Sequence, residues 1–150
     1  GGALVEIHWS LLTPRRYRAA ANFDAWLDTR TVVQTEKGRI FCLSRENELI
    51  ELVMHAFVHH ELDTLLKLVD IALVSRIPEL DWDYIVEWCG SCSTSRMFAV
   101  TLGLIHHLFE LSFDGHSRLV APNLPRGADG IFEAYAARYF GADSRAHGIA

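Results

Sequence analysis

The stretch SRENELIELVMHAFVHHELDTLLKLVD, residues 44–70, decides the fold of this chain. It contains two consecutive apolar segments with helical periodicity, and each segment carries one narrow polar stripe. The first stripe consists of Glu48, Glu51, His55 and His59, which fall within about 80° of arc at 100° per residue. The second consists of Asp63, Lys67 and Asp70, within about 60°. Helices this apolar belong inside a protein, so we expect each stripe to face water, a partner or a cleft.

The chain from Ser44 onward predicts a bundle of about five helices. Ser44 is a good N-cap, and the first helix should run to about residue 60. Cap and breaker residues place the other helices at residues 63–76, from Asp81 onward, at 95–111 and at 129–140. Gly141 is a natural C′ residue for the last helix. Residues 113–127 predict a loop, because Gly, Pro, Ser and Asn gather there.

The first 43 residues have a different pattern. Apolar and polar residues alternate from Val5 to Ser10, which is the period of a strand. A short helix should follow Asn22, and the β-prone runs 31–35 and 39–43 flank the turn sequence Glu-Lys-Gly and predict a hairpin. We therefore expect a mainly helical α+β protein. Residues 1–43 would be a partial α/β core with a short antiparallel β segment, 44–142 a helical domain and 143–150 a flexible tail.

A sheet this small usually belongs to something larger. We therefore expect the chain to be the back half of a longer protein, or a protein whose sheet is completed by a partner chain or a second copy. Its 150 residues, half of them hydrophobic and 22% charged, suffice for a real core. A net charge of −5 argues against general nucleic-acid binding, which needs a basic face.

The sequence contains no apolar run long enough for a membrane span, and we expect no signal peptide, because residues 1–4 lack a basic lead and a long apolar stretch. Three cysteines are an odd number, which favours a reducing, cytoplasmic environment over a disulfide scaffold. Cys89 and Cys92 have the redox spacing C-x-x-C, but a thioredoxin-like site needs a preceding strand. The pair follows a predicted helix, so we interpret it as part of a helix–helix turn.

Three groups of polar residues could carry chemistry. Glu6 and His8 share one face of their strand, where they could bind a divalent metal or act as a base, or could simply face solvent. Glu51, His55 and His59 form an i, i+4, i+8 ladder. Such a ladder could hold a metal if Glu51 or Asp63 supplies a third ligand, although we favour a polar seam between helices as its explanation.

Lys67 is the centre of the third group. It can pair with an acid on either side along its helix, Asp63 or Asp70. The functional alternative places Lys67 at a phosphate, with Asp70 holding it there.

The strand VEIHW at residues 5–9, the hairpin, the H-x-x-x-H of His55 and His59 and the L-V-D that ends at Asp70 together resemble a family of bacterial nucleotidyltransferase-like proteins. This family belongs to the polymerase-β-type superfamily, and the resemblance covers roughly residues 4–110. The motifs are moderately specific together and weak singly.

The resemblance implies an α/β core followed by a helical domain, with a nucleoside triphosphate and Mg²⁺ bound between them. It places Glu6 at the third of three metal-binding acids, as a catalytic residue and metal ligand. It also places His8, Lys67 and Asp70 on the nucleotide side. The Gly-Ser motif that opens a helix and the Asp-x-Asp strand of such proteins would have to lie before residue 1.

We therefore expect the C-terminal segment of a nucleotidyltransferase-like protein, or a degenerate member. The full-length protein would transfer a nucleotide to an unknown acceptor, and this chain alone would be inactive because one carboxylate cannot hold two metals. The alternative is a non-catalytic helical module that docks a partner through its sheet edge and apolar surface. A third hypothesis is a small metalloprotein built on His55 and His59.

Overall fold

A computed structural model describes residues 23–58, 62–112 and 115–141 of the chain. The elements are α2 (Phe23–Asp28), β1 (Thr31–Thr35), β2 (Gly38–Cys42), α3 (Arg45–Val58), α4 (Leu65–Ser75), α5 (Trp82–Ser91), α6 (Ser95–Phe109), the π-helical segment η1 (His116–Val120), α7 (Ala121–Asn123) and α8 (Ala128–Phe140). The predicted fold class, a short antiparallel β segment followed by a helical bundle, is confirmed. The described residues form seven helices instead of five, because the short α2 and α7 add to the five long ones.

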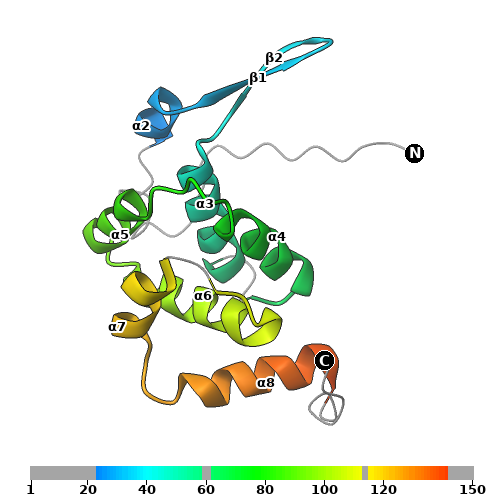
Figure 1. Ribbon diagram of the computed structural model, residues 1–150, viewed down its shortest axis with the longest axis vertical. Coiled ribbons are helices and arrows are strands. Elements are labelled where there is room, and N and C mark those ends of the chain that lie inside the picture. Colours follow the sequence, from blue (N-terminus) through cyan, green and yellow to red (C-terminus); the bar gives the residue numbers. More distant parts are fainter. Residues whose placement is uncertain (1–22, 59–61, 113–114, 142–150) are drawn as a thin grey trace.

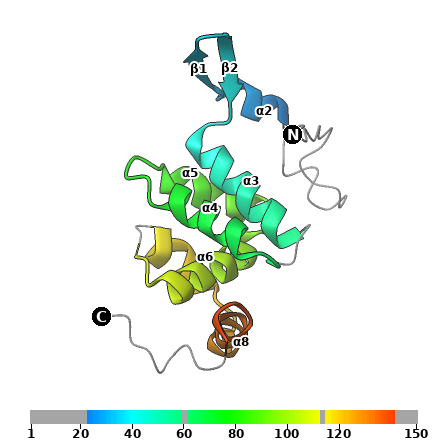
Figure 2. The same cartoon turned by 90° about the vertical axis from the view of Figure 1, so that its right-hand side faces the viewer.

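The two strands form a hairpin that projects from the helical body (Figures 1 and 2). Thr31 pairs with Cys42 and Thr35 with Gly38, so Glu36 and Lys37 form the turn. Gly38 has a φ of 135°, a conformation that favours glycine. In the described residues this sheet has two strands. The strand predicted at residues 4–10 lies outside them.

Local cap chemistry fixes the helix ends close to where the sequence predicts them. The Ser44 hydroxyl accepts a hydrogen bond from the Asn47 amide at 3.2 Å at the start of α3. The Asp81 carboxylate accepts one from the Tyr84 amide at 3.0 Å at the start of α5. Gly141, with a φ of 80°, ends α8 as expected. These side chains satisfy backbone groups that a helix end leaves without partners.

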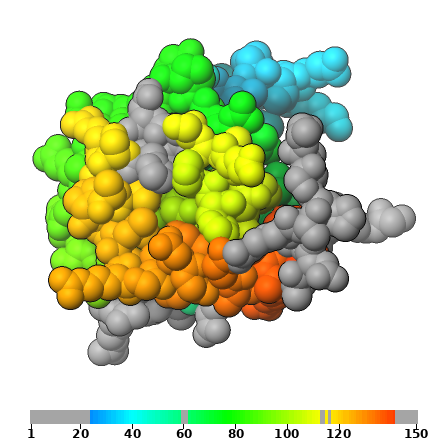
Figure 3. Space-filling model, turned by 60° about the horizontal axis from the view of Figure 1, so that its bottom comes forward, coloured from blue at the N-terminus to red at the C-terminus, as the bar shows by residue number. Residues whose placement is uncertain are grey.

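Helix α6 is the centre of the helical body. It contacts α3, α4 and α5 on one side and η1, α7 and α8 on the other. Its residues 101–105 are all buried, and Phe98 is fully buried one turn earlier. A β-carbon added at Gly103 would lie 2.9 Å from Cζ of Phe132, so the missing side chain lets α8 pack closely. Figure 3 shows α8 lying across this face of the molecule.

The prediction of a loop over residues 113–127 is wrong for residues 116–123 and holds for residues 124–127. Residues 116–123 form η1 and α7, and Leu119 and Val120 are buried in the core. Two adjacent apolar residues are too short a signal to show helical periodicity. Pro122 lies in the first turn of α7, where its missing N–H costs little. Pro122 is thus compatible with a helix, although the prediction treated it as a loop residue.

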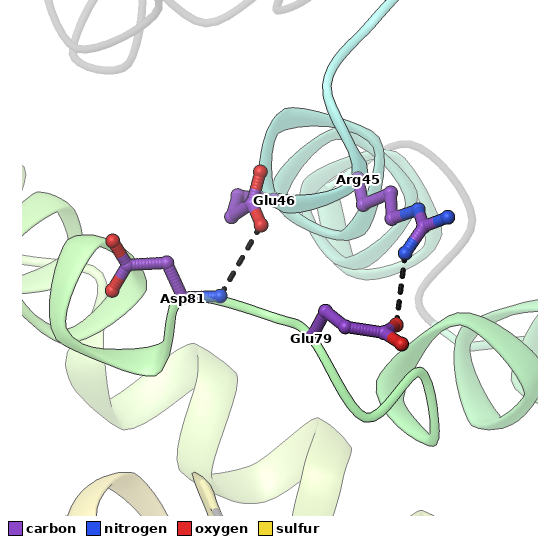
Figure 4. Close-up of polar contacts among 4 residues, drawn as sticks. All are labelled: Arg45, Glu46, Glu79 and Asp81. Carbon is purple, nitrogen blue, oxygen red and sulfur yellow. Dashed lines mark hydrogen bonds and ion pairs between the residues drawn. The ribbon is translucent and has the colours of Figure 1, made fainter.

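Polar contacts fasten the start of α3 to the segment before α5 (Figure 4). The Arg45 guanidinium forms a 3.0 Å ion pair with Glu79, and the Asp81 amide donates to Glu46 Oε1 at 3.2 Å. Asn47, in the same first turn of α3, is fully buried. No helix in the described part of the chain combines the length and apolarity that a bilayer crossing requires.

Candidate functional site

A groove of about 640 Å³ lies between the hairpin and the first half of α3. It is lined by Thr31, Val33, Cys42, Leu43, Arg45, Glu48, Glu51 and Leu52. The strand residues reach it because alternate side chains share one face of a hairpin and because Thr31 pairs with Cys42. The helix residues reach it through spacings of three and four. The volume lies within the usual range for ligand sites.

The groove presents acidic charge. Arg45 lines it, but its guanidinium is already paired with Glu79. Glu48 is exposed, and the carboxylate of Glu51 lies 3.8 Å from Nδ1 of His55. A triphosphate placed in this groove would meet two carboxylates whose charge repels it. The groove therefore suits neutral or cationic groups better than phosphates.

The predicted ladder of Glu51, His55 and His59 is brought together only in part. Glu51 and His55 are neighbours, and both side chains are about a quarter exposed. His59 lies outside the described residues. Within the described parts of the chain, no group of three or more His, Cys, Asp or Glu side chains is placed to hold a metal ion. The metalloprotein hypothesis thus finds no site there and stays a prediction.

In the second predicted stripe, Lys67 and Asp70 lie on α4 and Asp63 lies just before it, and none of the three lines the groove. Lys67 Nζ lies 3.4 Å from Oδ1 of Asp63, which is the local pairing expected from the spacing. Asp70 is exposed on the same helix. Neither Lys67 nor Asp70 lines the groove that contains Glu51.

Glu6 and His8, the residues implied as the metal ligand and its neighbour, lie outside the described residues. The described residues do not themselves form a site that fits Mg²⁺, because they contain no cluster of carboxylates with the ligand number it needs. The structure therefore leaves the predicted metal site on Glu6 as a prediction.

The chain contains an Asp-x-Asp spacing that serves a helix start. Asp81 caps α5, and Asp83 forms a 2.5 Å ion pair with Arg118. The Gly90-Ser91 dipeptide lies at the end of the same helix. These residues thus have structural partners, and they occur in the reverse of the Gly-Ser then Asp-x-Asp order that the resemblance implies.

Our interpretation of the C-x-x-C pair as a helix–helix turn holds for Cys92 alone, because Cys89 lies within the last turn of α5. Cys89 is fully buried, and burial raises the pKa of its thiol to about 12. A thiol with so high a pKa has almost no thiolate at neutral pH and is a poor nucleophile. Cys92 is the C-cap residue of α5.

The sequence did not single out Arg45 or the hairpin residues of the groove. Glu48 and Glu51 were visible as a polar stripe, but the opposite wall comes from strands whose position relative to α3 depends on tertiary packing. Asn47 was also missed. It donates to the Thr29 hydroxyl at 2.9 Å and accepts from the Tyr84 hydroxyl at 2.8 Å. Nothing in the local pattern distinguishes it from an exposed residue of the first helical turn.

Comparison with protein families matches residues 1–110 to a family described as an uncharacterised nucleotidyltransferase. The matched residues run to the end of α6, so η1, α7 and α8 lie beyond them. Comparisons with curated proteins and with solved structures found no match. The family match covers well over half of the sequence, so this chain belongs to the uncharacterised nucleotidyltransferase family.

Proposed function

We propose that the protein containing this chain transfers a nucleoside monophosphate from a nucleoside triphosphate to an acceptor, with Mg²⁺ as cofactor. The observation that carries the proposal is the family match over residues 1–110. It spans both the segment with Glu6 and the helices from α2 to α6. In the proposal, Glu6 is a metal ligand and His8 lies beside the nucleotide. The described helices wall one side of the nucleotide site.

The proposal places the triphosphate at Lys67 on α4, and not in the groove that contains Glu48 and Glu51. The present ion pair of Lys67 does not prevent this role, because that pair is easily exchanged. An exposed i, i+4 ion pair such as the one between Lys67 and Asp63 contributes only about 0.5 kcal/mol. A phosphate oxygen can therefore replace the Asp63 carboxylate, with Asp70 one turn further along the helix.

The test uses the native protein and the 150-residue chain side by side. Each is incubated with Mg²⁺ and α-labelled nucleoside triphosphates, and transfer of label is measured. We expect the native protein to transfer label and Glu6→Gln to abolish transfer. We expect Lys67→Ala to raise KM about tenfold, the change that loss of about 1.4 kcal/mol of binding produces.

Lys37→Ala is the matched control, because Lys37 is an exposed lysine in the hairpin turn. The 150-residue chain alone should show no transfer and no micromolar binding of ATP by calorimetry. Activity in the Glu6→Gln protein would refute the proposed catalytic role. Equal KM values for Lys67→Ala and Lys37→Ala would remove Lys67 from the nucleotide site.

The second candidate is a non-catalytic interaction module. It is favoured by the hairpin, where Val32, Val33, Ile40 and Phe41 are 48–57% exposed on a two-stranded sheet. Exposed apolar strands are typical docking edges. Under this hypothesis Phe41→Lys would abolish partner binding in a protein that never transfers label. Under the first hypothesis, transfer would survive Phe41→Lys.

A further inference from the structure

Helix α4 is apolar on two opposite faces. One face packs into the core through Leu68, Ile71 and Ala72. The other carries Leu66, which is 70% exposed, and Leu73, which is 62% exposed. At 100° per residue Leu66 and Leu73 fall within about 20° of arc. A helix that is apolar on both faces is typical of packing on both sides.

This outer face is open in the described structure. Figure 1 shows α4 at the edge of the helical body, and Figure 2 brings it to the front. We define the α4 outer face as Leu66, Asp70 and Leu73. A charged residue, Asp70, lies within the apolar stripe, at about 40° from Leu66. An apolar surface laid over this face would desolvate the carboxylate, whereas a partner that brings a positive charge beside it would pair it.

We propose that the α4 outer face binds the same face of a second copy of this chain, with the two helices antiparallel. A two-fold axis between residues 69 and 70 places Leu66 opposite the partner's Leu73, and the reverse. The contact then buries four exposed leucines, namely Leu66 and Leu73 of each copy. A closed, self-complementary pairing of this kind is the commonest symmetry of protein dimers.

Charge complementarity selects the antiparallel arrangement. Lys67 and Asp70 lie on the same side of the stripe, at about 100° and 40° from Leu66. In the antiparallel pair, Lys67 lies within two residues, or about 3 Å along the axis, of the partner's Asp70. Two such pairs flank the two-fold axis and neutralise the two Asp70 carboxylates. In a parallel pair the two-fold axis runs along the helices, so Lys67 and the partner's Asp70 lie on opposite sides of the stripe and cannot pair.

The size of the face predicts a weak dimer. One face of the 11-residue helix α4 is smaller than the roughly 800 Å² per partner of a standard stable interface. We therefore expect dissociation in the micromolar range, which sedimentation velocity can follow between about 5 and 200 μM. The inference does not depend on nucleotidyl transfer. Because Lys67 is also proposed to meet phosphate, association is measured without nucleotide.

Directed disulfides test the register in a Cys42→Ser, Cys92→Ser background, where the remaining Cys89 is buried. Leu66→Cys protein mixed with Leu73→Cys protein should form a crosslinked dimer under mild oxidation. Each variant alone should crosslink far less. Two copies of position 66 lie about 10 Å apart along the axis, beyond the roughly 7 Å that a disulfide spans between α-carbons.

Charge and apolar variants give a second readout. Leu73→Asp should weaken association at least tenfold, and Lys67→Glu should weaken it several-fold. Combining Lys67→Glu with Asp70→Lys should restore it, because the two charges exchange places. Ile131→Asp is the matched control, since Ile131 is an apolar side chain on α8 with 43% exposure. It should leave association unchanged.

Three results of the association measurements would overturn the proposal. One is a monomer at 200 μM, another is equal crosslinking in the mixed and single-variant samples, and the third is no recovery in the charge-exchanged protein. Protection of the Leu66→Cys thiol from alkylation in the monomeric native protein would also overturn the proposal. That result would assign the α4 outer face to another part of the same protein.

Discussion

The hydrogen bond between Asn47 and Tyr84 gives a quantitative test of how α3 is joined to α5. Asn47 is fully buried, and its Oδ1 accepts from the Tyr84 hydroxyl at 2.8 Å. Tyr84→Phe removes the donor and leaves a buried carbonyl oxygen without its partner. Such a loss costs about 1–2 kcal/mol. At about 2–4 °C per kcal/mol for a chain of this length, Tm should fall by about 2–8 °C.

A double-mutant cycle separates this hydrogen bond from the effects of each side chain alone. Asn47→Leu should cost about 2–3 kcal/mol, because it also strips Thr29 of its 2.9 Å bond to Asn47 Nδ2. The double variant should cost about 1 kcal/mol less than the sum, since the second change removes an interaction already lost. Urea unfolding followed by circular dichroism measures all four free energies of unfolding.

Tyr139→Phe is the matched control. Its hydroxyl donates to the Leu62 carbonyl, so it also loses a hydrogen bond, but it shares no partner with Asn47. Its effect should add to that of Asn47→Leu within about 0.5 kcal/mol. Full additivity of Asn47→Leu with Tyr84→Phe would refute the argument that this bond couples α3 to α5.

Three further predictions concern the core. Gly103→Ala should destabilise the protein by about 1 kcal/mol in urea unfolding, because crowding of Phe132 outweighs the better helix propensity, and Phe132→Leu should relieve part of this cost. Thr101→Val should stabilise by about 1 kcal/mol in the same assay, because the Thr101 hydroxyl is buried without a hydrogen-bond partner. The free energy of unfolding should fall as pH rises above 9, because the unfolded chain ionises Cys89 at its ordinary pKa of 9.0 while the folded chain holds that pKa at about 12. Cys89→Ala should flatten this decline, and an unchanged slope would contradict it.

Sequence reasoning succeeded where the determining chemistry is local. The starts of α3 and α5 follow from Ser44 and Asp81, whose side chains cap their own helices. The hairpin follows from Gly38, which supplies the backbone freedom that the turn requires. In each case the deciding atoms lie within three residues of each other along the chain, so one sequence suffices to identify them.

Sequence reasoning failed where the deciding partner is distant along the chain. Leu119 and Val120 become helical and buried because they pack on α6, and their own neighbours resemble a loop. The candidate groove shows the same limit. Its helix wall was visible as the stripe through Glu51, whereas the opposite wall depends on the angle at which the hairpin leaves α3. The hydrophobic periodicity of the sequence carries no information about that angle.

The family match and the folding unit have different boundaries, and this difference bears on any functional assay. The matched residues end with α6, yet the buried side chains Leu119, Val120 and Phe132 come from the segment beyond. They cover a helix whose residues 101–105 are all buried, so removing them would expose the centre of the core. A fragment cut at residue 110 would therefore lose activity through unfolding, whatever its chemistry. Assays of nucleotide binding or association must retain α8 to report on function rather than on stability.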